Sequence, residues 1–256
     1  MADPVANIVE IVGLRKAFGG IVVADDINLQ LTAGQVVGLI GPNGAGKTSL
    51  FNLMSGVVTP DAGSVLLDGK PLDGCKMHVR ARRGLSRTWQ NLRLFPSLSV
   101  IDNLMVAVRD YKGEKLSNVL FAPARLAKAE REYRDKAHRV LEDTGLASVA
   151  DKAAADLTFG QQKLVGVARA LMNDARCLLL DEPMAGVEGQ AYEIMQKVVR
   201  KVAASGVAIC VVEHNVAFIR DLCDEGVFMF AGRILARGAV GTLISDPHLT
   251  ELYFGT

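Results

Sequence analysis

Gly41-Pro42-Asn43-Gly44-Ala45-Gly46-Lys47-Thr48 stands directly after the apolar run Val36–Ile40 and before a segment with helical spacing over residues 47–57. The stretch fits the pattern G-x-x-x-x-G-K-[ST], which binds phosphate when a buried strand precedes it and a helix follows it. A glycine-rich turn without a ligand would need neither the lysine nor the threonine at its last two positions. The sequence therefore predicts a nucleoside triphosphate site.

The residue types of this loop account for its chemistry. Glycines let the backbone curl so that successive N–H groups point inward as an anion nest, and the following helix adds its positive N-terminal end. We expect Lys47 to reach the β- and γ-phosphates. The hydroxyl of Thr48 is a hard oxygen ligand of the kind that Mg²⁺ prefers.

The composition argues against several classes of protein. The 256 residues carry a net charge of +1, which gives neither a basic field for nucleic acid nor an acidic, disordered composition. Apolar runs such as Val207–Val212 are too short to span a membrane, and Met1–Glu10 has no signal-peptide pattern. No C-x-x-C pair occurs among the four cysteines, and Cys177 and Cys210 lie in apolar runs that favour buried thiols. These features indicate a reduced, cytosolic, globular protein.

The N-terminal part of the chain is rich in strand patterns. Ile8–Val12, Ile27–Leu31 and Ser64–Leu67 predict strands, which suggests antiparallel strands packed beside a nucleotide-binding core. Phe18 stands at the edge of the turn Phe18-Gly19-Gly20. Its ring is either part of the core or a stacking platform for a purine, and the local sequence leaves both readings open.

Residues 99–155 are more charged and more helical than the segments on either side. Val100–Val108 and Ala124–Leu146 have helical spacing, and Pro123 suits the start of the second helix. We interpret this region as an inserted helical lobe. The basic cluster Arg80–Arg83 just before it is a nucleic-acid patch or, more simply, a solvated face. Gln90 closes the strand-like run after that cluster, where an amide could contact Mg²⁺ or the attacking water.

Thr158 precedes a helical pattern and has two interpretations. Its hydroxyl can cap the helix, or the helix start Thr158-Phe159-Gly160-Gln161-Gln162 can serve as a second anion site.

Two further runs place polar residues at the carboxyl ends of buried strands, which is where α/β proteins bind ligands. Asp181 and Glu182 follow the apolar run Cys177–Leu180. One carboxylate can accept Mg²⁺, and the other can polarise a water aimed at the γ-phosphate. His214 follows the run Val207–Val212, and it could bond the γ-phosphate or orient the base.

Taken in order over its whole length, the chain resembles the nucleotide-binding subunit of ATP-binding-cassette (ABC) transporters. The resemblance implies a single ABC ATPase domain, residues 1–256, of α/β class. It has a P-loop NTPase core with a mostly parallel sheet, an N-terminal antiparallel β-subdomain (core and subdomain in 1–98 and 156–256) and an inserted α-helical lobe (99–155). The residues expected to hold ATP are Phe18 on the adenine, Gly41, Pro42, Asn43, Gly44, Ala45, Gly46, Lys47, Thr48 and Ser49 on the phosphates, and Thr158, Phe159, Gly160 and Gln161 of the family signature.

The same resemblance assigns the chemistry. Thr48, Gln90 and Asp181 are implied Mg²⁺ ligands, Glu182 is the implied general base, and His214 is the switch histidine. Lys47 and Gln90 join Glu182 and His214 among the catalytic residues. The expected reaction is ATP hydrolysis coupled to transport across a membrane.

Two departures from the family pattern concern the signature and the loop after Pro183. The signature normally begins Ser-Gly-Gly, so Phe159 replaces a glycine and must point away from the nucleotide. Glu188 stands where the family usually has an aspartate, in the loop through which the family couples its two subunits.

Other features are similar to the branch that takes up branched-chain or other hydrophobic amino acids. They are the aromatic before Gly160-Gln161-Gln162, the run Arg87–Phe95 and the tail Leu252-Tyr253-Phe254-Gly255. This branch also includes importers of amides, urea and aromatic acids. The alternatives are the cassette of a lipid or export system and a soluble ABC ATPase without a membrane partner.

The family implies that two subunits, as a homodimer or a heterodimer, close on two ATP molecules. The other expected partners are membrane permease subunits and, indirectly, a substrate-binding protein, with no nucleic acid. The expected location is peripheral, on the cytoplasmic face of the inner membrane. Leu94, Phe95, Leu98 and Val100 are candidates for the permease-docking surface, and packing inside the lobe is the rival interpretation.

Overall fold

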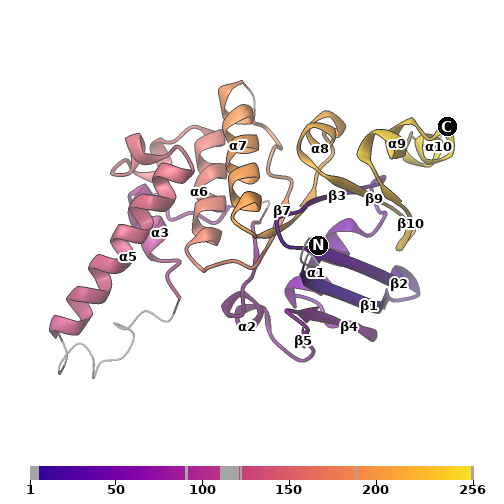
Figure 1. Cartoon of the computed structure of the whole chain (residues 1–256), viewed down its shortest axis with the longest axis horizontal. Helices are drawn as coiled ribbons and strands as arrows, with labels where there is room; N and C mark the ends of the chain where they lie inside the picture. The colour runs from indigo at the N-terminus through magenta and orange to yellow at the C-terminus, as the bar shows by residue number, and fades with distance from the viewer. Residues whose placement is uncertain (1–5, 90–91, 110–120, 122, 188, 255–256) are drawn as a thin grey trace, which may run out of the picture. The chain divides into compact units, whose positions relative to one another are not determined.

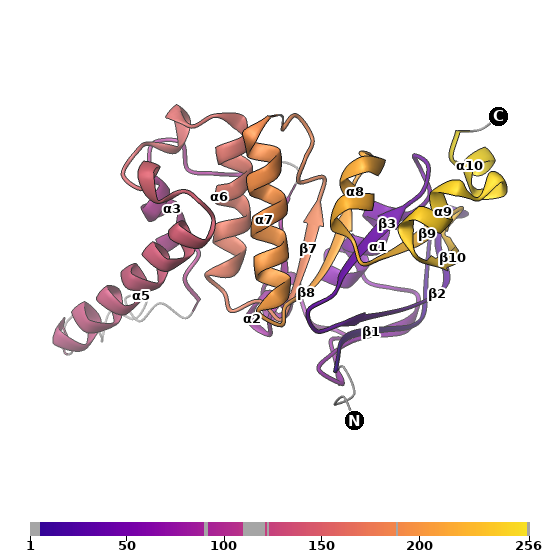
Figure 2. The ribbon, with the colours of Figure 1, turned by 45° about the horizontal axis from the view of Figure 1, so that its top comes forward.

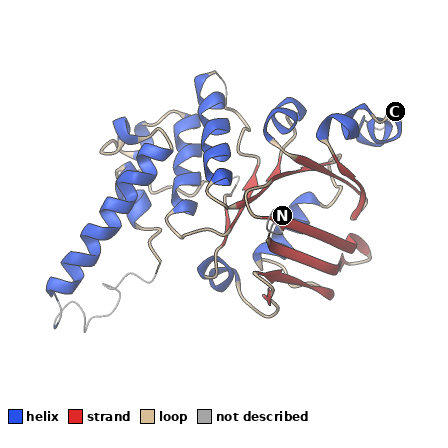
Figure 3. Ribbon diagram, viewed as in Figure 1, coloured by secondary structure: helices blue, strands red, loops and turns tan. Residues whose placement is uncertain are grey.

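The computed structural model describes residues 6–89, 92–109, 121, 123–187 and 189–254. Its internal contacts divide the chain into two units: unit 1 is Met1–Gln90, Ala175–Ala185 and Val199–Thr256, and unit 2 is Asn91–Asp174 and Gly186–Val198. Both sheets belong to unit 1, whereas helices dominate the described part of unit 2 (Figure 3). The predicted lobe, residues 99–155, lies within unit 2, and its boundaries stay a prediction.

A six-stranded sheet has the order β10-β9-β3-β8-β7-β6 (Figure 1). Every neighbouring pair is parallel except β9 and β10, which form an antiparallel hairpin. The strands are β3 (Val36–Ile40), β6 (Leu85–Arg87), β7 (Cys177–Asp181), β8 (Ala208–Val212), β9 (Glu225–Phe230) and β10 (Arg233–Gly238). β3, β7 and β8 are buried at every position, as their uninterrupted apolar sequences require in a parallel sheet. The predicted α/β fold class is confirmed.

The second sheet is antiparallel, with the order β2-β1-β4-β5. Its strands are β1 (Asn7–Phe18), β2 (Ile21–Thr32), β4 (Ala62–Leu67) and β5 (Lys70–Pro71). The first two strands extend well beyond the predicted Ile8–Val12 and Ile27–Leu31. Register shifts interrupt the pairing of β1 with β2 between Ile11 and Leu14 and again between Leu14 and Lys16, so the alternation of apolar and polar residues breaks where the strands continue.

Helix α1 (Lys47–Ser55) shares one apolar core with strands of both sheets (Figure 1). Its Leu50, Phe51, Leu53 and Met54 are fully buried. Strand β3 lies beside helix α8 (Val216–Leu222) (Figure 2). On β3, Gly38 has no room for a side chain, because an added Cβ would be 2.7 Å from Cγ2 of Ile219. Helices α9 (Val240–Ser245) and α10 (Pro247–Phe254) end the described chain.

The arginine cluster after β5 is only partly a solvated face. Arg80 lies in helix α2 (Met77–Arg82) and is 3% exposed, although Arg82 and Arg83 are exposed. Its Nη1 donates to the carbonyls of Leu53 (2.9 Å) and Met54 (2.8 Å) at the end of α1. Burial lowers the pKa of Arg80 from its ordinary value. The sequence interpretation was therefore wrong for this residue, because the carbonyls of the last turn of a helix lack N–H partners from a following turn and take donors from elsewhere in the chain.

Unit 2 contains helices α3 (Val100–Met105), α5 (Pro123–Asp143) and α6 (Phe159–Leu171), the 3₁₀ turns η2 (Ala147–Val149) and η3 (Ala154–Asp156), and the first part of α7 (Gln190–Ala204). α5 begins at Pro123, as predicted. Of the four residues proposed for permease docking, Val100 is fully buried and belongs to the packing of this unit, whereas Phe95 is 44% exposed.

The four cysteines are free. Cys177 and Cys210 are buried, as their apolar runs predict. Burial raises the pKa of Cys177 to about 12 and that of Cys210 well above its ordinary value, so both stay as neutral thiols. In the part of the chain that the structure describes, no helix is long and apolar enough to cross a membrane.

Candidate functional site

The predicted phosphate loop joins β3 to α1. Gly41 has a φ of 151°, and an added Cβ would lie 2.1 Å from the carbonyl oxygen of Met229. Gly46 has a φ of 102°, and a Cβ there would lie 2.5 Å from the carbonyl oxygen of Val23. Only glycine fits both positions, so the loop forms a narrow backbone cradle at the N-terminus of α1.

Lys47 and Thr48 open α1 with different surroundings. Lys47 is 6% exposed, and its ammonium donates to the carbonyls of Gly41 (2.6 Å) and Pro42 (2.9 Å), so the side chain folds back over the loop. Burial lowers the pKa of Lys47, and the negative charge of Glu182 partly opposes that shift. Thr48 is exposed, which leaves its hydroxyl available to a cation. The loop thus fits a phosphate chain with its cation.

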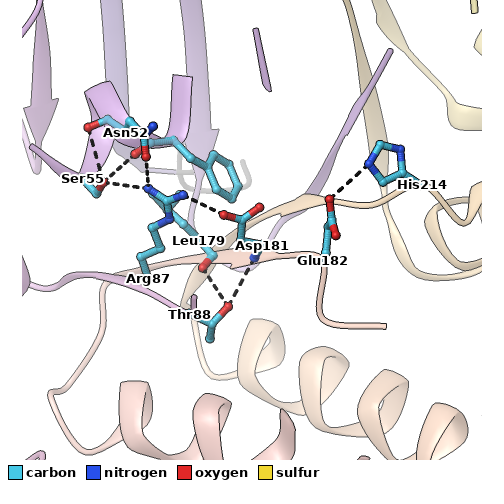
Figure 4. A network of polar contacts seen from close by, with 9 residues as sticks. Asn52, Ser55, Arg87, Thr88, Leu179, Asp181, Glu182 and His214 are labelled. Atoms are coloured by element: carbon cyan, nitrogen blue, oxygen red, sulfur yellow. Dashed lines mark hydrogen bonds and ion pairs between the residues drawn. The ribbon is translucent and has the colours of Figure 1, made fainter. Parts of the chain in front are cut away.

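Asp181 and Glu182 lie together where β7 ends (Figure 4). Asp181 is 7% exposed, and its carboxylate is a hard oxygen donor that fits Mg²⁺. Glu182 has a left-handed φ of 48°, which is unusual for a residue other than glycine. Its N–H donates to the carbonyl of Val212 on β8 (2.9 Å), which holds this turn in place. Strain of this kind, about 1–3 kcal/mol, concentrates at functional sites.

Glu182 faces the predicted switch histidine. Nε2 of His214 lies 3.1 Å from Oε1 of Glu182, and the two side chains come from the ends of neighbouring strands β7 and β8 (Figure 4). The imidazole is 47% exposed and the carboxylate 19% exposed, so both can meet a ligand. The structure brings together the side chains of Glu182 and His214, which the sequence predicted to lie at the same strand edge from two separate runs.

Glu213 is a buried carboxylate beside this pair to which the sequence analysis gave no role. It is 5% exposed, and it accepts hydrogen bonds from the N–H groups of Met184 (2.5 Å) and His214 (3.1 Å). Burial raises the pKa of Glu213, and the backbone donors partly oppose that shift. The carboxylate connects the segment after Pro183 to the backbone at His214. In the sequence, the feature that could have indicated this role is a charged residue directly after the buried run Val207–Val212.

Arg87, which the sequence analysis used only as part of a run similar to one branch, also reaches the site. Its Nη2 lies 2.7 Å from Oδ2 of Asp181 (Figure 4). Ninety-four positions separate the two residues, and they meet because β6 lies beside β7 in the sheet.

Phe18, the predicted adenine-stacking residue, ends β1 and is 48% exposed, which excludes the core interpretation. The Lys16 ammonium lies 5.2 Å from the centre of its ring. Asp61 accepts hydrogen bonds from Lys16 (2.7 Å) and from the N–H of Ala17 (2.9 Å), which anchors the strand just before the ring. The ring is thus held at the surface and can stack on a base.

In unit 2, Thr158 caps helix α6. Its hydroxyl accepts the N–H of Gln161 (3.3 Å), and the Gln161 amide oxygen accepts the N–H of Thr158 (3.0 Å). The Phe159 ring packs on Gly186, where an added Cβ would lie 3.0 Å from the ring, and the Lys163 ammonium lies 5.5 Å from the ring centre. Gly160 has no room for a Cβ, which would meet Ala191 at 2.7 Å. The cap is therefore present, and the anion-site role stays a prediction.

Of the residues used in the sequence predictions, Gln90, Asn91, Glu188 and Gly255 lie outside the described residues.

Comparison with known proteins identifies the family. The sequence pattern described as ABC transporter matches residues 24–185, which include the phosphate loop and the Asp181–Glu182 pair. The chain belongs to the ABC transporter family. It is an ABC ATPase, and the predicted family and enzyme class are confirmed.

Curated relatives of this ABC ATPase include proteins of import and of export. The high-affinity branched-chain amino acid transport ATP-binding protein BraF of Pseudomonas aeruginosa is 34% identical, with 97% of this chain and 98% of that protein covered. LivG of Escherichia coli K12, which has the same description, is 32% identical with 95% and 96% covered. The lipopolysaccharide export system ATP-binding protein LptB of Escherichia coli K12 is also 32% identical, with 94% and 95% covered.

Solved structures support the same assignment. The ADP conformation of an ATP-binding cassette of an ABC transporter superposes with a TM-score of 0.83 at 27% identity, covering 98% of this chain and 99% of the other. A nucleotide-free ATP-binding cassette gives a TM-score of 0.82 at 29% identity, covering 98% and 100%. The ABC ATPase family binds ATP and ADP.

Proposed function

We propose that this ABC ATPase hydrolyses ATP to drive the uptake of branched-chain or other hydrophobic amino acids through a membrane permease. Glu182 and His214, 3.1 Å apart at the end of the strands, carry the proposal for hydrolysis. Similarity to BraF and LivG, together with the run Arg87–Phe95, supports the choice of cargo.

In this proposal Glu182 is the general base. Its carboxylate accepts a proton from the water that attacks the γ-phosphorus, the bond from that phosphorus to the β–γ bridging oxygen breaks, and ADP leaves with the bridging oxygen. His214 orients the carboxylate or donates to the γ-phosphate. Lys47 leaves the carbonyls of Gly41 and Pro42 and bonds the phosphate oxygens, where it stabilises the developing charge.

Thr48 and Asp181, with Gln90, would hold Mg²⁺, which when bound neutralises charge on the β- and γ-phosphates. The donor set supports this assignment, because both described residues offer hard oxygens. Phe18 would stack on the adenine, because its ring is exposed at the surface.

We further propose that two subunits share each site, with the chain bound to membrane permease subunits at the cytoplasmic face of the inner membrane. ATP on the loop Gly41–Thr48, extended by Ser49, of one subunit would be capped by Thr158–Gln161 of a second. Each side brings a helix N-terminus to the triphosphate. The exposed hydroxyl-bearing cap of α6 supports the second contact, and the packing of Phe159 on Gly186 supports its pointing away from the nucleotide.

Mixed dimers of two differently tagged copies test the shared site. A dimer of a Thr158→Ala copy and a Glu182→Gln copy should keep one intact site and turn over ATP there. A dimer that carries both changes in one copy and neither in the other should have no intact site and lose turnover. The reverse pattern would show that Thr158 acts on its own chain's nucleotide. Because Thr158 caps α6, Thr158→Ala should also destabilise the helix by about 1 kcal/mol, and Thr158→Ser, which keeps the hydroxyl, is the matched control.

Reconstitution tests the cargo. The ATPase is assembled with its permease subunits in proteoliposomes, and ATP turnover is measured with the binding protein loaded in turn with leucine, isoleucine, valine, an amide, urea or an aromatic acid. We expect stimulation and uptake with the branched-chain amino acids. A complex with Glu182→Gln subunits gives the background rate.

Export of lipopolysaccharide or another lipid is the second candidate, because LptB covers the chain as fully as LivG does at the same identity. Stimulation by lipid, with none by any loaded binding protein, would favour export and contradict amino-acid import.

A further inference from the structure

Arg87 holds the carboxylate that the proposed function assigns to Mg²⁺. It ends β6, which pairs in parallel with β7, and its Nη2 donates to Oδ2 of Asp181 at 2.7 Å. Both side chains are buried, with 4% and 8% of their surfaces exposed. An ion pair this far from solvent is screened little by salt.

The guanidinium is fixed by contacts that do not involve Asp181. Its Nη1 donates to Oδ1 of Asn52 (2.7 Å) and to the hydroxyl of Ser55 (3.2 Å), both on α1 (Figure 4). Its other neighbours are the rings of Trp89 and Phe51, whose centres lie 4.5 Å and 5.6 Å from Cζ. Arg87 therefore has a defined position from which it can orient Asp181.

The partners on α1 place this arginine between the two described metal ligands. Asn52 follows Thr48 by four positions, so the two residues lie on the same face of the helix one turn apart. One guanidinium thus connects the helix that carries Thr48 with the strand that carries Asp181. The planar fork of arginine suits this bridge, because one nitrogen serves each side.

We propose that Arg87 is a positioning residue for the divalent cation that accompanies ATP. Because Arg87 bonds Oδ2 of Asp181, the other carboxylate oxygen is left to face the cation. Arg87 also fixes the position of β7 relative to the face of α1 that carries Thr48. The inference rests on the proposed assignment of Thr48 and Asp181 as metal ligands. A purely structural ion pair is the rival explanation, although buried pairs of this kind contribute little net stability compared with apolar packing.

The test separates nucleotide binding from cation binding. The affinity for ATPγS is measured in excess EDTA and in excess Mg²⁺, and bound Mn²⁺ is counted by electron paramagnetic resonance, for the parent, Arg87→Gln, Asp181→Asn and the double variant. We expect cation-free affinity to change little in Arg87→Gln. The gain in affinity on adding Mg²⁺ should fall about 10-fold or more, as for other residues that orient metal ligands. The double variant should resemble Asp181→Asn, because both changes act through one carboxylate.

Arg80→Gln is the matched control. Arg80 is a buried residue, the side chain of Arg87 is also buried, and Arg80 likewise bonds α1, through the carbonyls of Leu53 and Met54. Loss of Arg80 should lower the melting temperature but leave unchanged the gain in ATPγS affinity on adding Mg²⁺.

The possible results are distinguishable. If Arg87→Gln keeps the parental gain in ATPγS affinity on adding Mg²⁺ and Asp181→Asn loses that gain, the role of Arg87 is overturned and the metal site stands. If Asp181→Asn keeps the parental gain in ATPγS affinity on adding Mg²⁺, the assignment of Asp181 as a metal ligand is itself overturned. If Arg87→Gln does not fold, Arg87→Lys, which keeps the charge but not the fork, takes its place in the same comparison, and a full gain in it would equally overturn the proposal.

Discussion

Glu182→Gln should retain ATP binding, lose turnover by roughly 100-fold or more and accumulate an ATP-bound dimer. The amide has the shape of the carboxylate and can still bond His214, which lies 3.1 Å away, but it cannot accept a proton from water. Turnover is measured as phosphate release, binding by equilibrium titration with ATP, and dimer formation by light scattering with and without ATP.

Glu225→Gln is the control for loss of a carboxylate on the same sheet. Glu225 begins β9 and pairs with Arg237 and Gln35, and the Arg237 hydrogen bond lowers its pKa. Its replacement should leave turnover close to that of the parent. Hydrolysis by Glu182→Gln at the parental rate would show that another group is the base.

Lys47→Ala should reduce the affinity for ATP by roughly 10- to 100-fold, since hydrogen bonds to charged groups contribute about 1.5–3 kcal/mol. Lys47 is 6% exposed, and its ammonium bonds the loop carbonyls of Gly41 and Pro42, within reach of an incoming phosphate chain. Binding of ATP is measured by calorimetry or with a fluorescent analogue.

The same variant loses donors to two loop carbonyls, so its melting temperature is measured alongside binding. Lys70→Ala, at the exposed start of β5, is the control and should bind ATP normally. Normal ATP binding by Lys47→Ala would contradict the phosphate role of the loop.

The sequence predicted those parts of the site whose neighbours in space are neighbours in the chain. Val36–Ile40 is a strand with the predicted bounds, and α1 begins at Lys47. Both follow from local patterns, because a run of apolar residues suits a buried parallel strand and a glycine-rich turn suits the start of a helix. The capping of α6 by Thr158 is equally local, since the capping box spans four residues.

The positions of Asp181, Glu182 and His214 at the ends of strands were also predictable, because the carboxyl ends of parallel strands lie at one edge of the sheet. The pairing of β7 with β8 then brings Glu182 to His214. The positive φ of Glu182 was not predictable, because glutamate has no intrinsic preference for that region.

By itself, the sequence determined the family, the phosphate loop and the strands that carry Asp181, Glu182 and His214. Only the tertiary structure decided that Arg80 caps α1, that Val100 is buried, and that Arg87 holds Asp181. The physical reason is that a buried polar group takes its role from the partner that satisfies it. For Arg87 that partner is ninety-four positions away and is brought close only by the order of strands in the sheet.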